Sequence, residues 1–176
     1  MPHAVYDLNR VDRITADAVG EPGHRVFFVQ ARKGRRLVTI VVEKEQLAAL
    51  TSAIDRLLLS LADDDPELVA DPEPAPESSS GLEGPLAPAF RAGQLSLGYD
   101  QVSGKVVVVA EELTEEEQDA KPSIARFWAT PAQMRAFSLH AQQAIAAGRP
   151  LCAVCGQPID PAGHFCPRRN GDRKAL

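Results

Sequence analysis

The sequence predicts an α+β protein made of two βββα units, with antiparallel meanders and packed helices, plus a small C-terminal Cys3His module of the zinc-knuckle type. Runs of β-branched and aromatic residues, separated by glycine turns, occur in two sets of three, and an amphipathic helical pattern follows each set. The chain's three cysteines all fall within one short C-terminal stretch. We place the parts at residues 1–62 (first unit), 63–89 (acidic Pro/Ser-rich flexible linker), 90–149 (second unit) and 150–176 (Cys-rich zinc-binding tail).

The first unit is expected to contain three strands and one long helix. The strands are predicted at residues 13–19, 26–31 and 37–42. Gly20-Glu21-Pro22-Gly23 supplies the first turn and Lys33-Gly34 the second. The helix is predicted from Glu43 to about Leu61, because its apolar residues recur at helical spacing.

The second unit repeats this order. Strands are predicted at residues 90–99, 105–110 and 124–129, with a turn over 100–104. A helix is predicted to start with a capping box, in which Thr130 is the N-cap and Gln133 the third helical residue. Aligning Gln46 with Gln133 places the two apolar helix stripes in register, which favours duplication of one unit. Any helix that packs on a sheet needs such a stripe, so the pattern alone leaves duplication open.

The charge of the chain is segregated. The 176 residues carry a net charge of −5, yet residues 63–85 hold eight acids and no Lys or Arg, whereas the tail from Gly148 holds five bases and two acids. Such an acidic segment buries too little apolar surface to offset its ordering entropy, so we expect a flexible loop. A second acidic run, from Glu111 to Asp119, is expected to form another exposed loop. Neither a signal pattern nor a membrane-spanning run is found, which predicts a cytoplasmic protein with no membrane contact.

The candidate metal ligands are Cys152, Cys155, His164 and Cys166. Two cysteines two residues apart can form a knuckle that offers both sulfurs to one metal, and Gly156 tolerates the tight turn that such a knuckle needs. A second knuckle would require a cysteine at position 169, where the chain has Arg169. The fourth ligand is therefore expected to be His164, with a water or a group such as Asp160 as the alternatives. The expected metal is zinc.

Two other interpretations of the thiols stay open at this stage. The cysteines can be reduced thiols in a loop without metal. A redox Cys-x-x-Cys pair is the second alternative, although that motif usually opens a helix and Pro158 and Pro161 disfavour one here. The odd cysteine number and the absence of a secretion signal disfavour a disulfide framework.

The rest of the chain contains no catalytic motif. His3, His24 and His140 are scattered and are interpreted as ordinary surface or boundary histidines. We find no nucleophile elbow and no phosphate-binding loop.

The chain resembles an uncharacterised actinobacterial family known as DUF3090. The resemblance rests on several segments and is most specific in the cysteine tail: Val19-Gly20-Glu21-Pro22-Gly23, Phe27-Phe28-Val29-Gln30-Ala31, Leu97-Gly98-Tyr99-Asp100, Thr130-Pro131-Ala132-Gln133, Cys152-Ala153-Val154-Cys155-Gly156 and His164-Phe165-Cys166-Pro167-Arg168. It covers nearly the whole chain outside the acidic linker. It implies a cytoplasmic bacterial protein and a turn at Asn170-Gly171, and it transfers no catalytic residue.

We therefore expect a zinc-binding protein that acts as a non-catalytic adaptor or accessory subunit through contacts with a protein partner. One alternative is a nucleic-acid-binding protein, in which Arg168 and Arg169 of the basic zinc tail would contact phosphates. The acidic segments disfavour it, because they would repel a polyanion. The other alternative is an enzyme with a cleft between the two βββα units.

Overall fold

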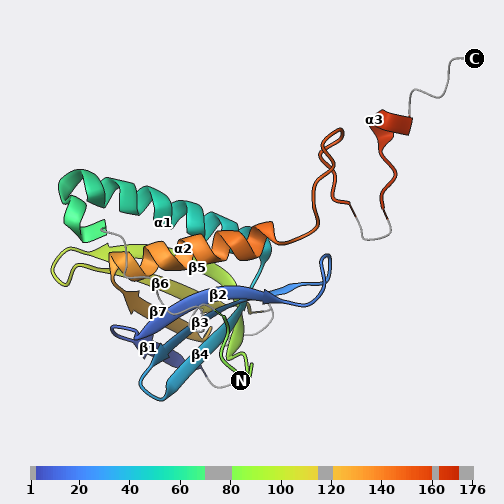
Figure 1. Cartoon of the computed structure of the whole chain (residues 1–176). Coiled ribbons are helices and arrows are strands. Elements are labelled where there is room, and N and C mark those ends of the chain that lie inside the picture. Colours follow the sequence, from blue (N-terminus) through green and yellow to red (C-terminus); the bar gives the residue numbers. More distant parts are fainter. Residues whose placement is uncertain (1–2, 70–80, 115–120, 160–162, 171–176) are drawn as a thin grey trace, which may run out of the picture.

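Figure 1 shows a computed structural model of the chain, in which residues 3–69, 81–114, 121–159 and 163–170 are described. The predicted strands and helices occur in the predicted order, and three further short elements accompany them. In chain order they are β1 (Val5–Leu8), β2 (Arg13–Val19), β3 (Val26–Lys33), β4 (Arg36–Val42), α1 (Lys44–Asp64), the 3-10 helix η1 (Pro66–Val69), β5 (Phe90–Asp100), β6 (Lys105–Glu112), β7 (Ile124–Ala129), α2 (Pro131–Ala146) and α3 (Pro167–Asn170).

The strands form one mixed sheet in the order β1-β7-β6-β5-β4-β3-β2. Strands β2, β3 and β4 form one antiparallel meander, and β5, β6 and β7 form the other. The two meanders join where β4 and β5 pair in parallel. The predicted α+β class and the twofold βββα order are confirmed, with both units contributing to a single sheet.

The sheet is strongly curled, because a short segment connects its two edges. A flat sheet would separate β1 from β2 by about 29 Å at the usual strand spacing. The five residue steps from Leu8 to Arg13 can span only about 17 Å. Within this segment the Val11 N–H donates to the Trp128 carbonyl at 2.8 Å, and the Asp12 N–H donates to the Arg32 carbonyl at 2.8 Å. The first hydrogen bond extends the pairing of β1 with β7, and the second extends the pairing of β2 with β3. The connection thus brings the two edges of the sheet together, and the sheet curls into a barrel-like shape.

One hydrophobic core fills the inside of this curve. Leu8, Val29, Ile40, Val108 and Phe127 come from five different strands, and each is at most 1% exposed. Helices α1 and α2 lie side by side over the sheet (Figure 1) and bury their apolar stripes in the same core. Helix α2 packs against β2 of the first unit, and α1 packs against β5 of the second, so the two units interlock. In the described part of the chain, no helix has the length and apolar character needed to cross a bilayer.

Both long helices begin in the same way. The predicted capping box of α2 is present. The Gln133 backbone N–H donates to the Thr130 hydroxyl at 3.1 Å, and the Thr130 backbone N–H donates to the Gln133 side-chain oxygen at 2.9 Å. Helix α1 has an equivalent box between Glu43 and Gln46. Each glutamine also donates to a backbone carbonyl of a strand or its extension, namely those of Ala92 and Gly93 for Gln46 and those of Val11 and Asp12 for Gln133. The capping residues therefore fix each helix on the sheet.

The structure departs from the sequence expectations in four places. Strand β1 was not predicted, and α1 runs three residues beyond Leu61. Glu111 and Glu112 belong to β6 rather than to an exposed loop, whereas residues 115–119 of that run lie outside the described residues. Within the segment predicted to be a flexible linker, Gly81, Glu83 and Ala89 hydrogen-bond to residues of the sheet.

Glu83 attaches the C-terminal part of the linker to the sheet. Its carboxylate accepts hydrogen bonds from Arg13 at 2.9 Å and from Arg32 at 3.1 Å. Its backbone N–H and carbonyl bond the buried side chain of Gln30. The linker contains no Lys or Arg, and Glu83 pairs instead with Arg13 and Arg32 of the sheet. Residues 70–80 of the linker lie outside the described residues.

Candidate metal centre

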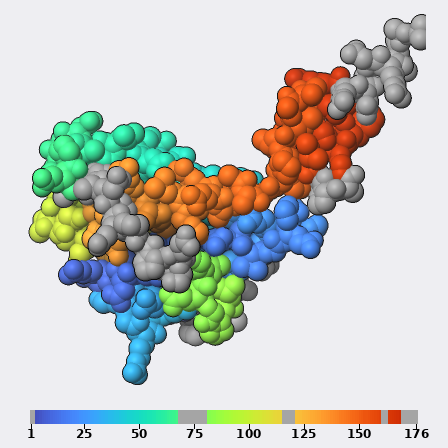
Figure 2. Space-filling view, viewed as in Figure 1, coloured from blue at the N-terminus to red at the C-terminus, as the bar shows by residue number. Residues whose placement is uncertain are grey.

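The cysteine-rich module follows α2 as a separate lobe. Residues 148–150 lead out of the helix, and residues 151–159 and 163–170 project away from the sheet and helices (Figure 1). In the space-filling view this lobe, coloured orange to red, stands apart from the main body (Figure 2). A module of this size has little apolar core, so a small unit of this kind usually needs a metal or disulfides to fold.

The first half of the module is a hairpin-like knuckle. Leu151 and Pro158 form an isolated antiparallel bridge, and the Cys152 N–H donates to the Gln157 carbonyl at 2.8 Å. Within this loop the Gly156 N–H donates to the Cys152 carbonyl at 2.8 Å. Gly156 has a φ of 72°, a conformation that glycine adopts without steric cost. This backbone turns the side chains of Cys152 and Cys155 to one side, as the spacing predicted.

The second half supplies the other two groups. His164 and Cys166 stand two residues apart in an extended segment just before α3, and Cys166 is 5% exposed. Arg168, in α3, donates to the Val154 carbonyl at 3.2 Å and so ties the second half to the knuckle. The two halves thereby face each other.

The four candidate ligand atoms converge. One ligand atom from each of Cys152, Cys155, His164 and Cys166 lies within 4.8 Å of the others. The Cys152 and Cys166 sulfurs are 4.0 Å apart, and the Cys155 sulfur lies 3.2 Å from the His164 Nε2 atom. Tetrahedral zinc, with Zn–S of about 2.3 Å and Zn–N of about 2.0 Å, places sulfurs about 3.8 Å apart and sulfur and nitrogen about 3.5 Å apart. The group can therefore hold a metal ion with little rearrangement.

The thiols differ in acidity. Backbone N–H groups of Cys155 and Val154 hydrogen-bond the Cys152 sulfur and lower the pKa of this thiol to about 6. The pKa of Cys155 is raised instead. The Gln157 N–H favours the Cys155 thiolate, but partial burial and the two neighbouring sulfurs outweigh that hydrogen bond. The Cys152 thiolate is therefore favoured at neutral pH, and a bound metal would displace the proton of Cys155.

The structure thus brings together all four residues that the sequence singled out. Asp160, the alternative fourth ligand, lies outside the described residues. The Cys-x-x-Cys pair sits in a turn rather than at the start of a helix, unlike the usual redox arrangement. The other three histidines do not belong to the cluster of candidate ligands. Of these, His140 lies on α2 and contacts Asp17 of β2 at 3.5 Å.

Comparison with models of protein families identifies the family of the chain. The family model described as "Protein of unknown function (DUF3090)" matches residues 6–166, so the chain belongs to this family. The match begins in β1 and ends at the last cysteine of the cluster. No curated protein and no solved structure matches the chain.

Proposed function

We propose that the protein is a zinc-binding, non-catalytic adaptor whose metal-stapled C-terminal module contacts a protein partner in the cytoplasm. The convergence of three thiols and one imidazole within 4.8 Å carries this proposal. Three thiolates and one imidazole form a common structural zinc shell, because soft sulfur ligands suit zinc and four ligands leave no open position for catalysis. Reduced thiols, which such a site requires, persist in the cytoplasm.

The surface of the module supports the adaptor role. Phe165 is 72% exposed, Leu151 66% and Val154 47%, which is a high apolar exposure for so small a lobe. These residues belong to the same segments as the ligands, so the metal would fix their relative positions. Apolar residues that stay exposed on a rigid module are typical of contact surfaces for other proteins.

A protein partner fits the module better than a nucleic acid does. The Arg168 guanidinium, which the nucleic-acid hypothesis assigns to phosphates, donates to the Val154 carbonyl within the module. The exposed aromatic Phe165 stands between His164 and Cys166, where zinc ligation would hold its backbone. We therefore assign Arg168 a structural role and Phe165 a role in binding the partner.

The test is capture of a partner by the purified 176-residue chain carrying its metal. We expect a stoichiometric partner that Phe165→Ser loses. Leu59→Ser is the matched control, because Leu59 is 69% exposed but lies on α1 within the main body. Removal of the metal by a chelator should release the partner as well.

Two results would contradict the adaptor role. One is the absence of any stoichiometric partner from lysate of the native host. The other is a partner that Phe165→Ser and Leu59→Ser retain equally well, because the contact would then not involve the module. Metal analysis of the same samples separates a lost contact from a lost zinc site.

A further inference from the structure

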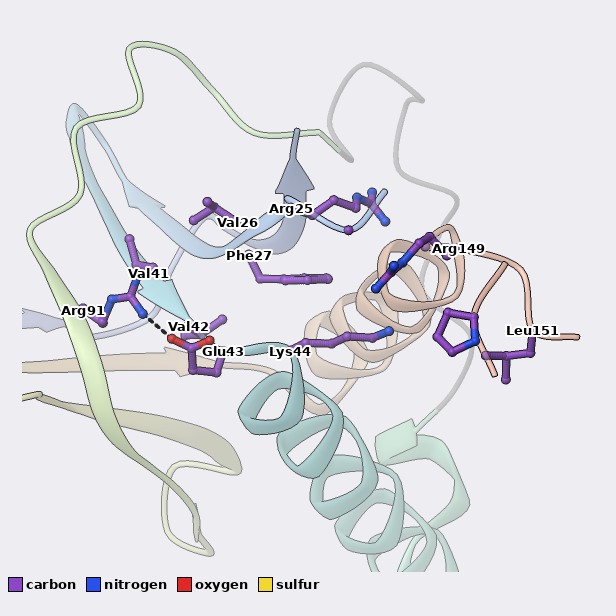
Figure 3. Close-up of a pocket in the computed structure, with 13 residues that line it drawn as sticks. Arg25, Val26, Phe27, Val41, Val42, Glu43, Lys44, Arg91, Arg149 and Leu151 are labelled. Carbon is purple, nitrogen blue, oxygen red and sulfur yellow. Dashed lines mark hydrogen bonds and ion pairs between the residues drawn. The ribbon is translucent and has the colours of Figure 1, made fainter. Parts of the chain in front are cut away.

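A pocket of about 280 Å³ lies where the barrel, the start of α1 and the beginning of the module meet. Its walls come from the hairpin of β2 and β3, from β4 and β5, and from the segment 148–158 after α2. Figure 3 shows the side chains that line it. None of the four candidate metal ligands is among the described residues of the lining.

Two of the basic side chains in the lining are held by partners of their own. The Arg25 guanidinium donates to the Ala144 carbonyl at 2.8 Å and lies 5.7 Å from the centre of the Phe27 ring. Arg91 forms an ion pair with Glu43 (Figure 3). Both guanidinium groups are therefore compensated within the protein.

The two other basic side chains do not require an anion in the pocket either. Arg149 has an interaction partner, and a Cβ atom placed on Gly23 would stand 3.4 Å from its Nε atom, so this side chain lies close to the turn before β3. Lys44 is the first residue of α1 and is exposed, so water can solvate its ammonium group. The lining as a whole therefore favours a neutral occupant.

Apolar side chains from the main body and from the module border the same space. Val26 of β3 is 41% exposed, and Leu151 and its bridge partner Pro158 are exposed on the module. Phe27 and Val42 also line the pocket, and both are buried in the hydrophobic core, which holds them rigidly. The pocket thus combines a rigid apolar floor with apolar walls that an occupant would remove from water.

The pocket continues the apolar surface of the module that we assign to the partner. Leu151 belongs both to the pocket lining and to that surface, which also includes Val154 and Phe165. A partner that covers the surface therefore reaches the pocket through Leu151. Interfaces typically place their strongest contacts where a large side chain of one protein fills a pocket of the other.

The size and the chemistry of the pocket suit an aromatic side chain. Its volume lies just below the range of about 300–1,000 Å³ that is typical of small-molecule sites, so it fits one large side chain better than a whole ligand. The negatively polarised face of a neutral ring can contact a guanidinium or ammonium group without altering the charge balance. The Arg25 guanidinium already makes such a contact with Phe27.

We propose that this pocket receives an aromatic side chain of the protein partner, with tryptophan as the best fit. The inference rests on the proposed adaptor function and names the anchor of that contact. The zinc site would also build one wall of the pocket, because Leu151 directly precedes Cys152 and its bridge to Pro158 closes the same knuckle. Loss of the metal would therefore open the pocket together with the module.

The test is a titration of the zinc-loaded 176-residue chain with N-acetyl-tryptophanamide, a neutral tryptophan analogue, followed by amide NMR. We expect saturable shifts at Val26, Phe27 and Leu151 at millimolar concentrations. Leu151→Ser and Val26→Ser should each weaken binding about fivefold, because each removes apolar surface that the ring would cover. N-acetyl-leucinamide should bind at least about threefold more weakly, since it has no ring to contact the cations. Val102→Ser is the matched control, because Val102 is 98% exposed and does not line the pocket, and its affinity should stay unchanged.

Several results would overturn the proposal. One is the absence of saturable shifts up to about 10 mM N-acetyl-tryptophanamide. Another is N-acetyl-leucinamide binding as tightly, since the pocket would then not select a ring. A third is an affinity that both Leu151→Ser and Val26→Ser leave unchanged. An affinity that survives removal of the zinc by a chelator would overturn the role of the metal in building the pocket wall.

The titration uses no partner, so its failure can be told apart from failure of the adaptor role. If the tryptophan analogue does not bind but Phe165→Ser still abolishes partner capture, only the proposed anchor site is wrong. If the analogue binds as expected and no partner is captured, the adaptor role is wrong instead.

Discussion

Replacing Leu8 by Ala tests whether β1 closes the barrel. Leu8 pairs with Phe127 in β7, and its side chain is 1% exposed inside the core. The substitution removes three buried carbon atoms, which at about 0.8 kcal/mol each amounts to about 2.4 kcal/mol. The cavity left behind raises the expected loss of unfolding free energy to about 3–4 kcal/mol. This is a large share of the roughly 5–15 kcal/mol that stabilises a typical domain.

Urea unfolding of the full chain, followed by far-UV circular dichroism, measures this loss. Val5→Ala is the matched control, because Val5 lies on the same strand with 47% of its surface exposed and should cost only about 0.5 kcal/mol. Equal losses of unfolding free energy from the two substitutions would contradict a buried, core-forming role of Leu8. They would show that β1 contributes backbone pairing at most and that the core does not extend to the edge of the sheet.

Three further predictions concern other parts of the molecule. Ser138→Ala should cost about 1–2 kcal/mol of unfolding free energy, since the Ser138 hydroxyl donates at 2.6 Å to Asp55 and links the two long helices; urea unfolding measures it. Glu83→Gln should cost about 0.5–1 kcal/mol, because its ion pairs are partly exposed, and the cost should shrink when unfolding is measured in high salt. In metal-free, reduced protein, alkylation of Cys152 should rise with a midpoint near pH 6, since the thiolate is the nucleophile and forms above the pKa. Cys155, whose pKa is raised, should react only at higher pH, as peptide mass spectrometry can measure.

Local sequence patterns predicted most of the fold. Strands β2–β7 and the start of α2 were recognisable because alternation, glycine turns and the Thr130 capping box are local signals. The convergence of the three cysteines and His164 was predictable for the same reason, since the four residues lie within 15 positions of the chain. Its convergence required only a knuckle and a short return segment.

The missing parts depend on contacts between distant residues. Strand β1 is four residues long, and its pairing partner β7 lies more than 100 residues away, so periodicity could not reveal it. Glu83 looked like part of a solvated acidic segment, whereas Arg13 and Arg32 hold it on the sheet. The pocket that Lys44 and Arg149 line could not be predicted from a sequence motif, because folding alone brings these two distant residues to one cavity.

We propose that Cys152, Cys155, His164 and Cys166 hold one zinc ion. Its most direct test is the metal content of the untagged protein by mass spectrometry of the eluted ions, with wild type beside Cys155→Ser and His164→Ala. His24→Ala is the matched control, because His24 is exposed and lies outside the cluster. We expect about one zinc per chain in wild type and His24→Ala, with loss of the ion in the two ligand variants. Freshly reduced wild-type protein without metal, or ligand variants that keep their zinc, would contradict it.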